Sequence, residues 1–112
     1  MKKIEAVIRE EQLPVVRAAL EEVGYPGITI IAVRGHGRQR GITQHYRGRE
    51  FTVDLLPKAK IELIVNDADA PRIVNTICEN ARTGAVGDGK IWVSTIDSVM
   101  RVRTGEVGEV AL

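Results

Sequence analysis

The segment from Thr83 to Val93 carries three glycines and a lysine directly before an apolar, β-branched run. Glycine lets the backbone approach a ligand closely and adopt positive φ angles. Successive backbone N–H groups in such a turn form a concave nest for an anion, and Lys90 adds a positive charge beside it. We therefore predict that this segment binds phosphate. The alternative is a tight turn leading into a strand, because Asp88-Gly89 is a frequent turn dipeptide.

The same segment resembles a Walker A loop only in part. Gly84, Gly89 and Lys90 have the spacing of G-x-x-x-x-G-K, but the next residue is Ile91 and offers no hydroxyl to a magnesium ion. The residues after Lys90 also predict a strand, whereas a Walker A loop leads into a helix. This pattern excludes a P-loop NTPase.

Two other segments are rich in glycine or arginine. The stretch from Gly35 to Lys58 has few core-like residues. It far exceeds the usual connection of about 4–6 residues, so we expect it to bind a ligand or partner, the alternative being a solvated insertion. The alternation of Val99–Arg103 predicts an extended chain with Arg101 and Arg103 on one side, where two guanidinium groups suit phosphate oxygens. The alternative for these arginines is a salt-bridged surface strand. Our interpretation is that three basic or glycine-rich elements converge on one polyphosphate, namely Gly35–Gly41, Gly87–Lys90 and Arg101–Arg103.

Hydrophobic periodicity predicts an α+β chain with the order βαβ-βαβ. The predicted strands are Lys3–Arg9, Ile28–Arg34, an alternating run that starts at Lys60, and Ile91–Ser94. One predicted helix runs from Leu13 to a stop at Gly24, and the other starts after an N-cap at Asp69. The run Ile28–Arg34 reads as a buried strand. This order is the split arrangement of ferredoxin-like domains. Because such a sheet carries helices on one face only, we predict that self-association covers the other face.

Composition limits the possible classes of protein. The chain has 112 residues, 44% of them apolar, which fits one domain over residues 1–112 with its own core. A net charge of +1 favours neither nucleic acid nor an anionic membrane. The single cysteine, Cys78, lies among apolar residues and is predicted to be a buried structural thiol. With no signal-like or membrane-length apolar run, we expect a cytoplasmic protein.

Taken together, the motifs resemble the PII nitrogen-regulatory protein family over essentially the whole chain. The family implies a ferredoxin-like homotrimer with a long T-loop, here at about 37–55, and a regulatory rather than an enzymatic role. The motifs that carry the resemblance are Thr83–Ile96, Gly35-x-Gly37-Arg38-Gln39-x-Gly41, Tyr46-Arg47-Gly48, Asp54-x-Leu56-Pro57-Lys58 and Arg101-x-Arg103-Thr104-Gly105-Glu106.

The resemblance also implies ligands. In this family ATP and ADP compete for clefts between subunits, and 2-oxoglutarate binds beside magnesium-ATP. The 2-oxoglutarate residues implied here are Gln39, which also holds the magnesium ion, Gly41 and Lys58, which meets the distal carboxylate. The nucleotide residues implied are Thr29, Glu62 and Ile64 near the base and ribose, with Gly35, Gly37, Arg38, Gln39, Gly87, Asp88, Gly89, Lys90, Arg101 and Arg103 toward the phosphates.

The T-loop residues indicate how such a protein would be controlled. Arg47 matches the arginine with which some family members block an ammonium transporter from its cytoplasmic face. The resemblance implies docking in the ADP-bound state and release with ATP and 2-oxoglutarate; glutamine synthetase or another nitrogen-metabolism enzyme is the alternative target. Phe51 and Arg49 stand where relatives carry a nucleotidylated tyrosine and a phosphorylated serine. We therefore expect control by small molecules alone.

Two other classes of function compete with this one. For an enzyme, no nucleophile, base and acid stand together, and His36 and His45 lack metal-ligand spacing. For an RNA-binding ferredoxin-like module, bases would stack on strand aromatics, but only Trp92 lies on a predicted strand. We predict that Trp92 is a packing residue.

Overall fold

The computed structural model describes residues 1–35, 42–46, 49–53 and 56–112, and for 42–46 and 49–53 the backbone alone. A four-stranded antiparallel sheet has the order β2-β5-β1-β6, and β3 and β4 pair as a separate antiparallel hairpin. This arrangement confirms the predicted α+β, ferredoxin-like βαβ-βαβ order. The elements are β1 (Lys2–Arg9), α1 (Leu13–Glu22), β2 (Thr29–Gly35), β3 (Ile42–Tyr46), β4 (Arg49–Val53), β5 (Leu56–Val65), α2 (Ala70–Ala81) and β6 (Gly89–Thr95), with short 3-10 helices at Glu10–Gln12 and Glu109–Ala111.

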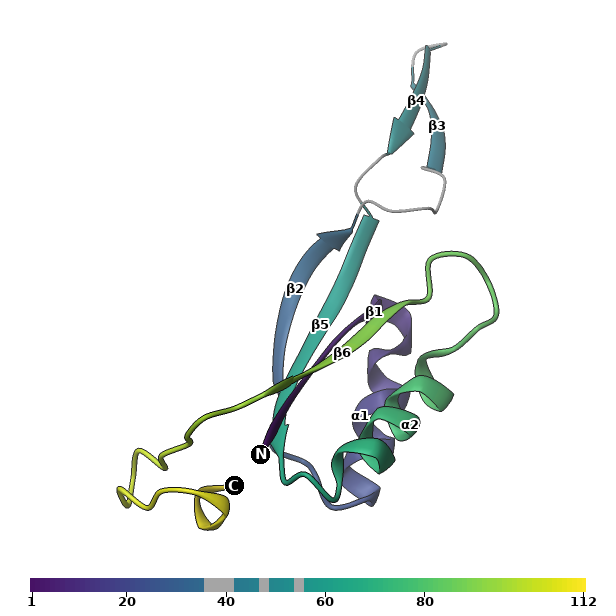
Figure 1. The fold of residues 1–112 in the computed structure, drawn as a ribbon. Coiled ribbons are helices and arrows are strands. Elements are labelled where there is room, and N and C mark those ends of the chain that lie inside the picture. The colour runs from purple at the N-terminus through teal and green to yellow at the C-terminus, as the bar shows by residue number, and fades with distance from the viewer. Residues whose placement is uncertain (36–41, 47–48, 54–55) are drawn as a thin grey trace.

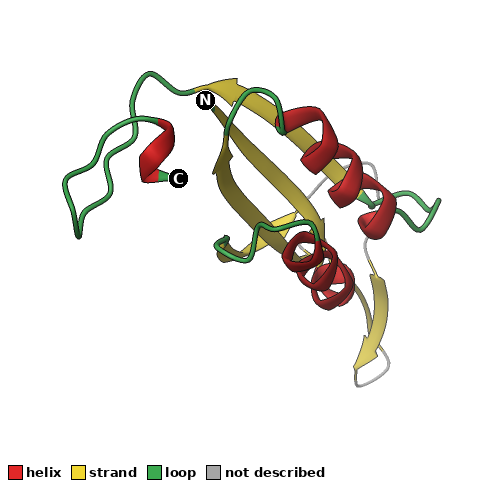
Figure 2. Cartoon of the chain, turned by 90° about the horizontal axis from the view of Figure 1, so that it is seen from below, coloured by secondary structure: helices red, strands yellow, loops and turns green. Residues whose placement is uncertain are grey.

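Both helices pack on the same face of the sheet (Figures 1 and 2). Strand residues alternate between buried and less buried positions along β1 and β5, which is the pattern of a sheet covered on one side. The helices contribute apolar residues at helical spacing to the same core. Its fully buried large side chains are Ile4, Ile8, Val16, Leu20, Ile61, Val65, Ile73 and Ile77.

The helix starts follow the predicted positions, with one correction. Pro14 and Pro71 lie in the first turns of α1 and α2, where a missing N–H costs little. Asp69 occupies the N-cap position of α2, but its side chain makes no capping hydrogen bond because its backbone is already in the αR region. Its carboxylate instead accepts a short hydrogen bond from the Tyr25 hydroxyl and pairs with Arg72 at 3.4 Å.

The exposure of strand residues corrects two predictions, and the face of the sheet away from the helices (Figure 1) is called here the open face. Strand β2 is an edge strand, and Ile30 and Ile31 remain 39% and 40% exposed, so it is not the buried strand that its composition predicted. Trp92 is 41% exposed on the open face rather than packed in the core, and the Lys60 ammonium lies 5.7 Å from its ring centroid. Composition alone does not reveal which face of a sheet the helices cover.

Several element boundaries also differ from the prediction. Strand β5 starts at Leu56 rather than near Lys60, and the long connection between β2 and β5 contains the β3–β4 hairpin. Val99–Arg103 is not an extended strand: Met100 bridges Val107, the Arg101 N–H donates to the Glu106 carbonyl at 2.9 Å, and residues 102–104 form the turn between them.

Two further observations concern the helices. Cys78 is only partly buried, at the margin of the core rather than within it, and its Sγ accepts a hydrogen bond from Arg82 Nη2 at 3.1 Å. In the part of the chain that the structure describes, neither helix is long and apolar enough to cross a membrane.

The core predicts a large cost for shortening a buried helix residue. Ile77→Ala is expected to lower the free energy of unfolding by about 2–5 kcal/mol, because Ile77 is fully buried and the lost methyl groups leave a cavity. The measurement is urea unfolding at one fixed protein concentration. The matched control Val15→Ala, at a residue 49% exposed on α1, is expected to cost less than about 0.5 kcal/mol. Equal losses for the two variants would contradict this account of the core.

Candidate functional site

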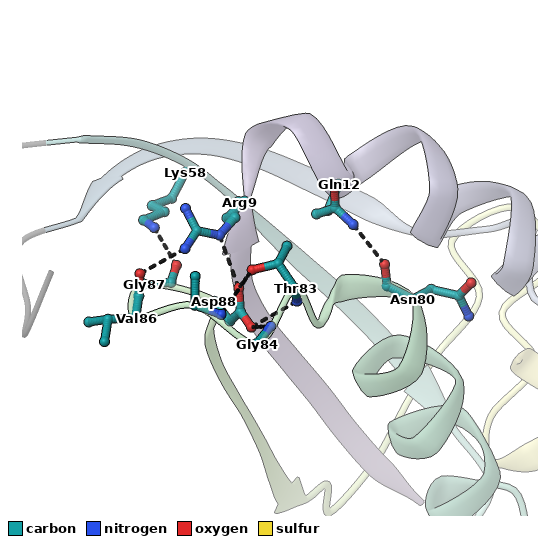
Figure 3. Close-up of polar contacts among 10 residues, drawn as sticks. Arg9, Gln12, Lys58, Asn80, Thr83, Gly84, Val86, Gly87 and Asp88 are labelled. Atoms are coloured by element: carbon teal, nitrogen blue, oxygen red, sulfur yellow. Dashed lines mark hydrogen bonds and ion pairs between the residues drawn. The ribbon is translucent and has the colours of Figure 1, made fainter.

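The candidate site is centred on the loop of residues 83–88, which connects α2 to β6 (Figure 3). The Asp88 carboxylate holds this loop together. Its Oδ2 accepts hydrogen bonds from the backbone N–H groups of Thr83 and Gly84, both at 2.9 Å, and its Oδ1 accepts one from the Thr83 hydroxyl. These hydrogen bonds, with that from Arg9, hold the pKa of Asp88 well below its usual range. The loop is thus built around a permanently ionised carboxylate.

Two cations from neighbouring strands reach the loop. Arg9 at the end of β1 and Lys58 in β5 are paired in the register of the sheet. Arg9 donates from Nε to Asp88 Oδ1 at 3.0 Å and from Nη2 to the Val86 carbonyl at 2.7 Å. Lys58 Nζ donates to the Gly87 carbonyl at 2.6 Å. Partial burial, and the nearby Arg9 charge after it, lower the pKa of Lys58.

The glycines of the loop have the backbone conformation that the sequence predicts. Gly84, Gly87 and Gly89 have φ angles of 88°, 101° and 101°. At Gly89 a Cβ atom would lie only 1.7 Å from the Val7 carbonyl oxygen, so β6 can approach β1 there only without a side chain. The backbone N–H groups of Val86, Gly87 and Asp88 donate to no acceptor in the described part of the chain. Adjacent N–H groups beside a positive-φ glycine are the arrangement expected of an anion nest, and phosphate binding there stays a prediction.

The residues expected near the base and ribose lie elsewhere on the open face. Thr29 is paired with Glu62 in the register of β2 and β5, and Ile64 follows two residues later on the same face. Glu62 is four residues from Lys58 along β5, a separation of about 13 Å. Lys60 lies between Glu62 and Glu5, at 3.0 and 2.9 Å, and its hydrogen bond lowers the pKa of Glu5.

The two C-terminal arginines lie in a third place. Arg101 and Arg103 are in the segment beyond the far end of β6, at the opposite end of that strand from the 83–88 loop (Figure 1). Arg101 is held by Glu106 at 2.9 Å and by the Val110 carbonyl at 2.8 Å. Within the described residues, Arg101 and Arg103 therefore do not meet the 83–88 loop of the same chain.

Around the loop, the structure brings together only part of the predicted set. Gly35 lies against the Lys58 side chain, since a Cβ there would be 3.0 Å from Lys58 Cγ. Gly35 and Lys58 form one cluster with the loop residues Gly87 and Asp88 and with Gly89 and Lys90 at the start of β6. Within the described residues, no group of three or more His, Cys, Asp or Glu side chains could hold a metal ion. The predicted residues Gly37, Arg38, Gln39, Gly41 and Arg47 lie outside the described residues.

Sequence reasoning missed Arg9 and the organising role of Asp88. Arg9 is 79 positions from Asp88 in the chain, and only the pairing of β1 with β5 and β6 brings it to the loop. The Asp88 carboxylate is committed to hydrogen bonds within the loop and to Arg9, so a phosphate contact by this residue would use its backbone N–H. The Asp-Gly turn signal marked the position of Asp88 without indicating its partners.

A shallow cavity of about 420 Å³ lies beside this cluster, between α2 and β6. The apolar residues Ile8, Val74, Ala81 and Ile91 line it, together with Cys78. Arg82 and Lys90 add charged residues to its lining. The cavity is on the helix side of β6 and holds none of the residues expected to contact the base.

Comparison with known proteins gives one consistent result. The family model described as nitrogen regulatory protein P-II matches residues 1–106. The chain is 54% identical over 112 residues to nitrogen regulatory protein P-II 2 of Methanothermobacter thermautotrophicus, covering 100% of this chain and 97% of that protein. It is 50% identical over 108 residues to nitrogen regulatory protein P-II of Rhizobium meliloti, covering 96% of each. It is 49% identical over 112 residues to nitrogen regulatory protein P-II of Pasteurella multocida, covering 100% of each.

The loop glycines predict a difference between two alanine variants. Gly84→Ala is expected to cost about 1–2 kcal/mol of unfolding free energy, because a side chain disfavours positive φ and no atom lies within 4 Å of the new Cβ. Gly89→Ala adds a clash with the Val7 carbonyl and is expected to cost about 1–3 kcal/mol more. Denaturant unfolding of both variants measures the difference. Equal costs would mean that β6 does not approach β1 as closely as the structure describes.

Proposed function

The chain belongs to the nitrogen regulatory protein P-II family, and from this premise we propose that it is a signal protein that senses ATP, ADP and 2-oxoglutarate and controls an ammonium transporter. The observation that supports nucleotide binding most directly is the 83–88 loop. Val86 and Gly87 offer two N–H groups, and Lys90 follows at the start of β6. Such a loop suits the oxygens of a di- or triphosphate. Its role would be regulatory rather than enzymatic.

The nucleotide sites would lie between the subunits of a homotrimer. Within one chain the phosphate loop, the group at Thr29 and Glu62, and the pair Arg101 and Arg103 stand apart, so a single copy presents an incomplete set. The open face leaves half-buried charges and an exposed Trp92 without cover, and Val102 in the C-terminal segment is 99% exposed. A second and third copy packed around these surfaces would bury them and bring one chain's base-binding residues toward another's phosphate loop.

Lys58 is the residue proposed to recognise 2-oxoglutarate. Its ammonium lies beside the phosphate loop, 2.6 Å from the Gly87 carbonyl, so an acid bound there would adjoin the nucleotide phosphates. The charge suits a carboxylate. We propose that Gln39 supplies an amide oxygen to a magnesium ion shared by the phosphates and the acid, a ligand type that suits this hard cation, and that Gly41 adds an N–H. Among the residues that the structure describes, Lys58 is thus the one through which bound 2-oxoglutarate would affect nucleotide binding.

The proposed output is control of a transporter by the T-loop. Arg47 would enter the cytoplasmic exit of an ammonium transporter in the ADP-bound state, and ATP with 2-oxoglutarate would release it. This places the protein in the cytoplasm, in contact with the membrane only through its partner. Regulation of glutamine synthetase or another enzyme of nitrogen metabolism is the second candidate, because the relatives' names specify nitrogen regulation without naming a target.

The sensing proposal predicts coupled binding. Titration calorimetry with magnesium-ATP is expected to show saturable binding, strengthened at least about fivefold by saturating 2-oxoglutarate, because coupled sites typically differ by 1–3 kcal/mol. Lys58→Ala is expected to abolish the enhancement while ATP alone still binds, and sedimentation of the same samples verifies the trimer. If 2-oxoglutarate does not change the affinity for ATP, only the sensing of adenine nucleotides would remain of the proposal. If the protein binds no ATP, the nucleotide proposal is refuted.

The output proposal predicts a specific role for one arginine. Capture of the protein by an ammonium transporter in ADP is expected to weaken by more than about tenfold in Arg47→Ala, because a buried interfacial arginine commonly contributes 2 kcal/mol or more. Arg49→Ala, in the same loop, is the matched control and is expected to bind within about threefold of the parent. Equal capture of all three proteins would refute the transporter-blocking role of Arg47.

A further inference from the structure

Arg9 lies next to the proposed phosphate loop without belonging to the predicted ligand set. Its side chain is largely buried, 15% exposed, and its two side-chain hydrogen bonds within the described residues go to the loop. We propose that Arg9 is a positioning residue for nucleotide binding: it holds the 83–88 loop, through Asp88 and the Val86 carbonyl, in the conformation that presents backbone N–H groups to a phosphate. The inference rests on the proposed nucleotide site and concerns how that site is prepared.

The negative charge of Asp88 needs a cation beside it. Its carboxylate organises the loop by accepting from Thr83 and Gly84, but a carboxylate beside a phosphate site also repels the phosphate. The Arg9 guanidinium, with its Nε 3.0 Å from Oδ1, compensates that charge. The loop can therefore keep the Asp88 carboxylate as its hydrogen-bond acceptor and still bind an anion.

Arg9 and Lys58 also fix the orientation of two peptide groups in the loop. In a planar trans peptide the C=O and the following N–H point in opposite directions. Arg9 Nη2 holds the Val86 carbonyl at 2.7 Å, so the Gly87 N–H is directed away from Arg9. Lys58 holds the Gly87 carbonyl at 2.6 Å, so the Asp88 N–H is directed away from Lys58 (Figure 3). The Gly87 and Asp88 N–H groups are thus oriented by cations that bind the carbonyl oxygens of the same peptide groups.

This geometry separates a positioning role from direct contact. A guanidinium that binds the carbonyl side of the Val86–Gly87 peptide stands opposite the N–H that would meet the phosphate. The effect of Arg9 on nucleotide affinity must then pass through its loop partners, of which Asp88 is the charged one. In a variant without the Asp88 carboxylate, replacing Arg9 should therefore change nucleotide affinity much less than it does in the parent protein.

A double-mutant cycle on the full-length protein tests this dependence, with ADP affinity measured by titration calorimetry. Arg9→Met is expected to weaken ADP binding about tenfold or more, since hydrogen bonds to charged groups contribute about 1.5–3 kcal/mol. In the Asp88→Asn background, Arg9→Met is expected to change affinity by less than about threefold. Arg17→Met, at an exposed arginine of α1, is the matched control and should bind like the parent. Equal losses in both backgrounds would show that Arg9 does not act through Asp88 and would overturn the proposal.

A second measurement needs no nucleotide. In the ligand-free protein, Arg9→Met is expected to speed amide hydrogen exchange at Thr83 and Gly84, whose N–H groups depend on Asp88, and to leave exchange in α1 unchanged. Unchanged exchange at these two amides would overturn the positioning role even if ADP affinity fell. A parent protein that binds no ADP would refute the proposed function, whereas ADP binding unchanged by Arg9→Met would refute this inference alone.

Discussion

The antiparallel pairing of the central strand β1 with β5 on one side and β6 on the other determines most of what this molecule presents to a ligand. It sets Arg9 opposite Lys58 and Gly89 opposite Ile8. Because side chains alternate along a strand, a shift of one residue would move the core isoleucines to the open face. The buried residues of β1, together with the two helices, therefore fix the register of the sheet. The same register brings the cations Arg9 and Lys58 to the 83–88 loop.

The loop itself illustrates how a weakly structured segment acquires a defined shape. It has no regular secondary structure, and its order comes from one carboxylate that satisfies the N–H groups at its beginning. Hydrogen bonds to a charged acceptor are stronger than those between neutral groups. The N–H groups not used in this way are adjacent and lie beside a positive-φ glycine. A preformed loop of this kind gives up little entropy when an anion binds.

Unlike the loop, the open face and the C-terminal segment of a single chain leave apolar side chains exposed. Charged groups at Lys60, Glu5 and Glu62 form a paired network there, but Trp92 and Val102 remain exposed. Apolar surface of this kind is favourable to bury. The trimer proposed above would bury it between copies, and it would account for both the separation of the predicted nucleotide residues in one chain and the exposure of this surface.

The sequence by itself determined the order of elements, the helix starts at Pro14 and Pro71, the positive-φ glycines of the loop and, through its motifs, the family. These are local properties, set by periodicity, by proline and glycine geometry and by near-contiguous residue patterns. Only the tertiary structure decided that β2 and Trp92 are exposed and that Arg9 joins Asp88. Each of these depends on which strands become neighbours, and contacts between residues far apart in the chain leave no local signal in a single sequence.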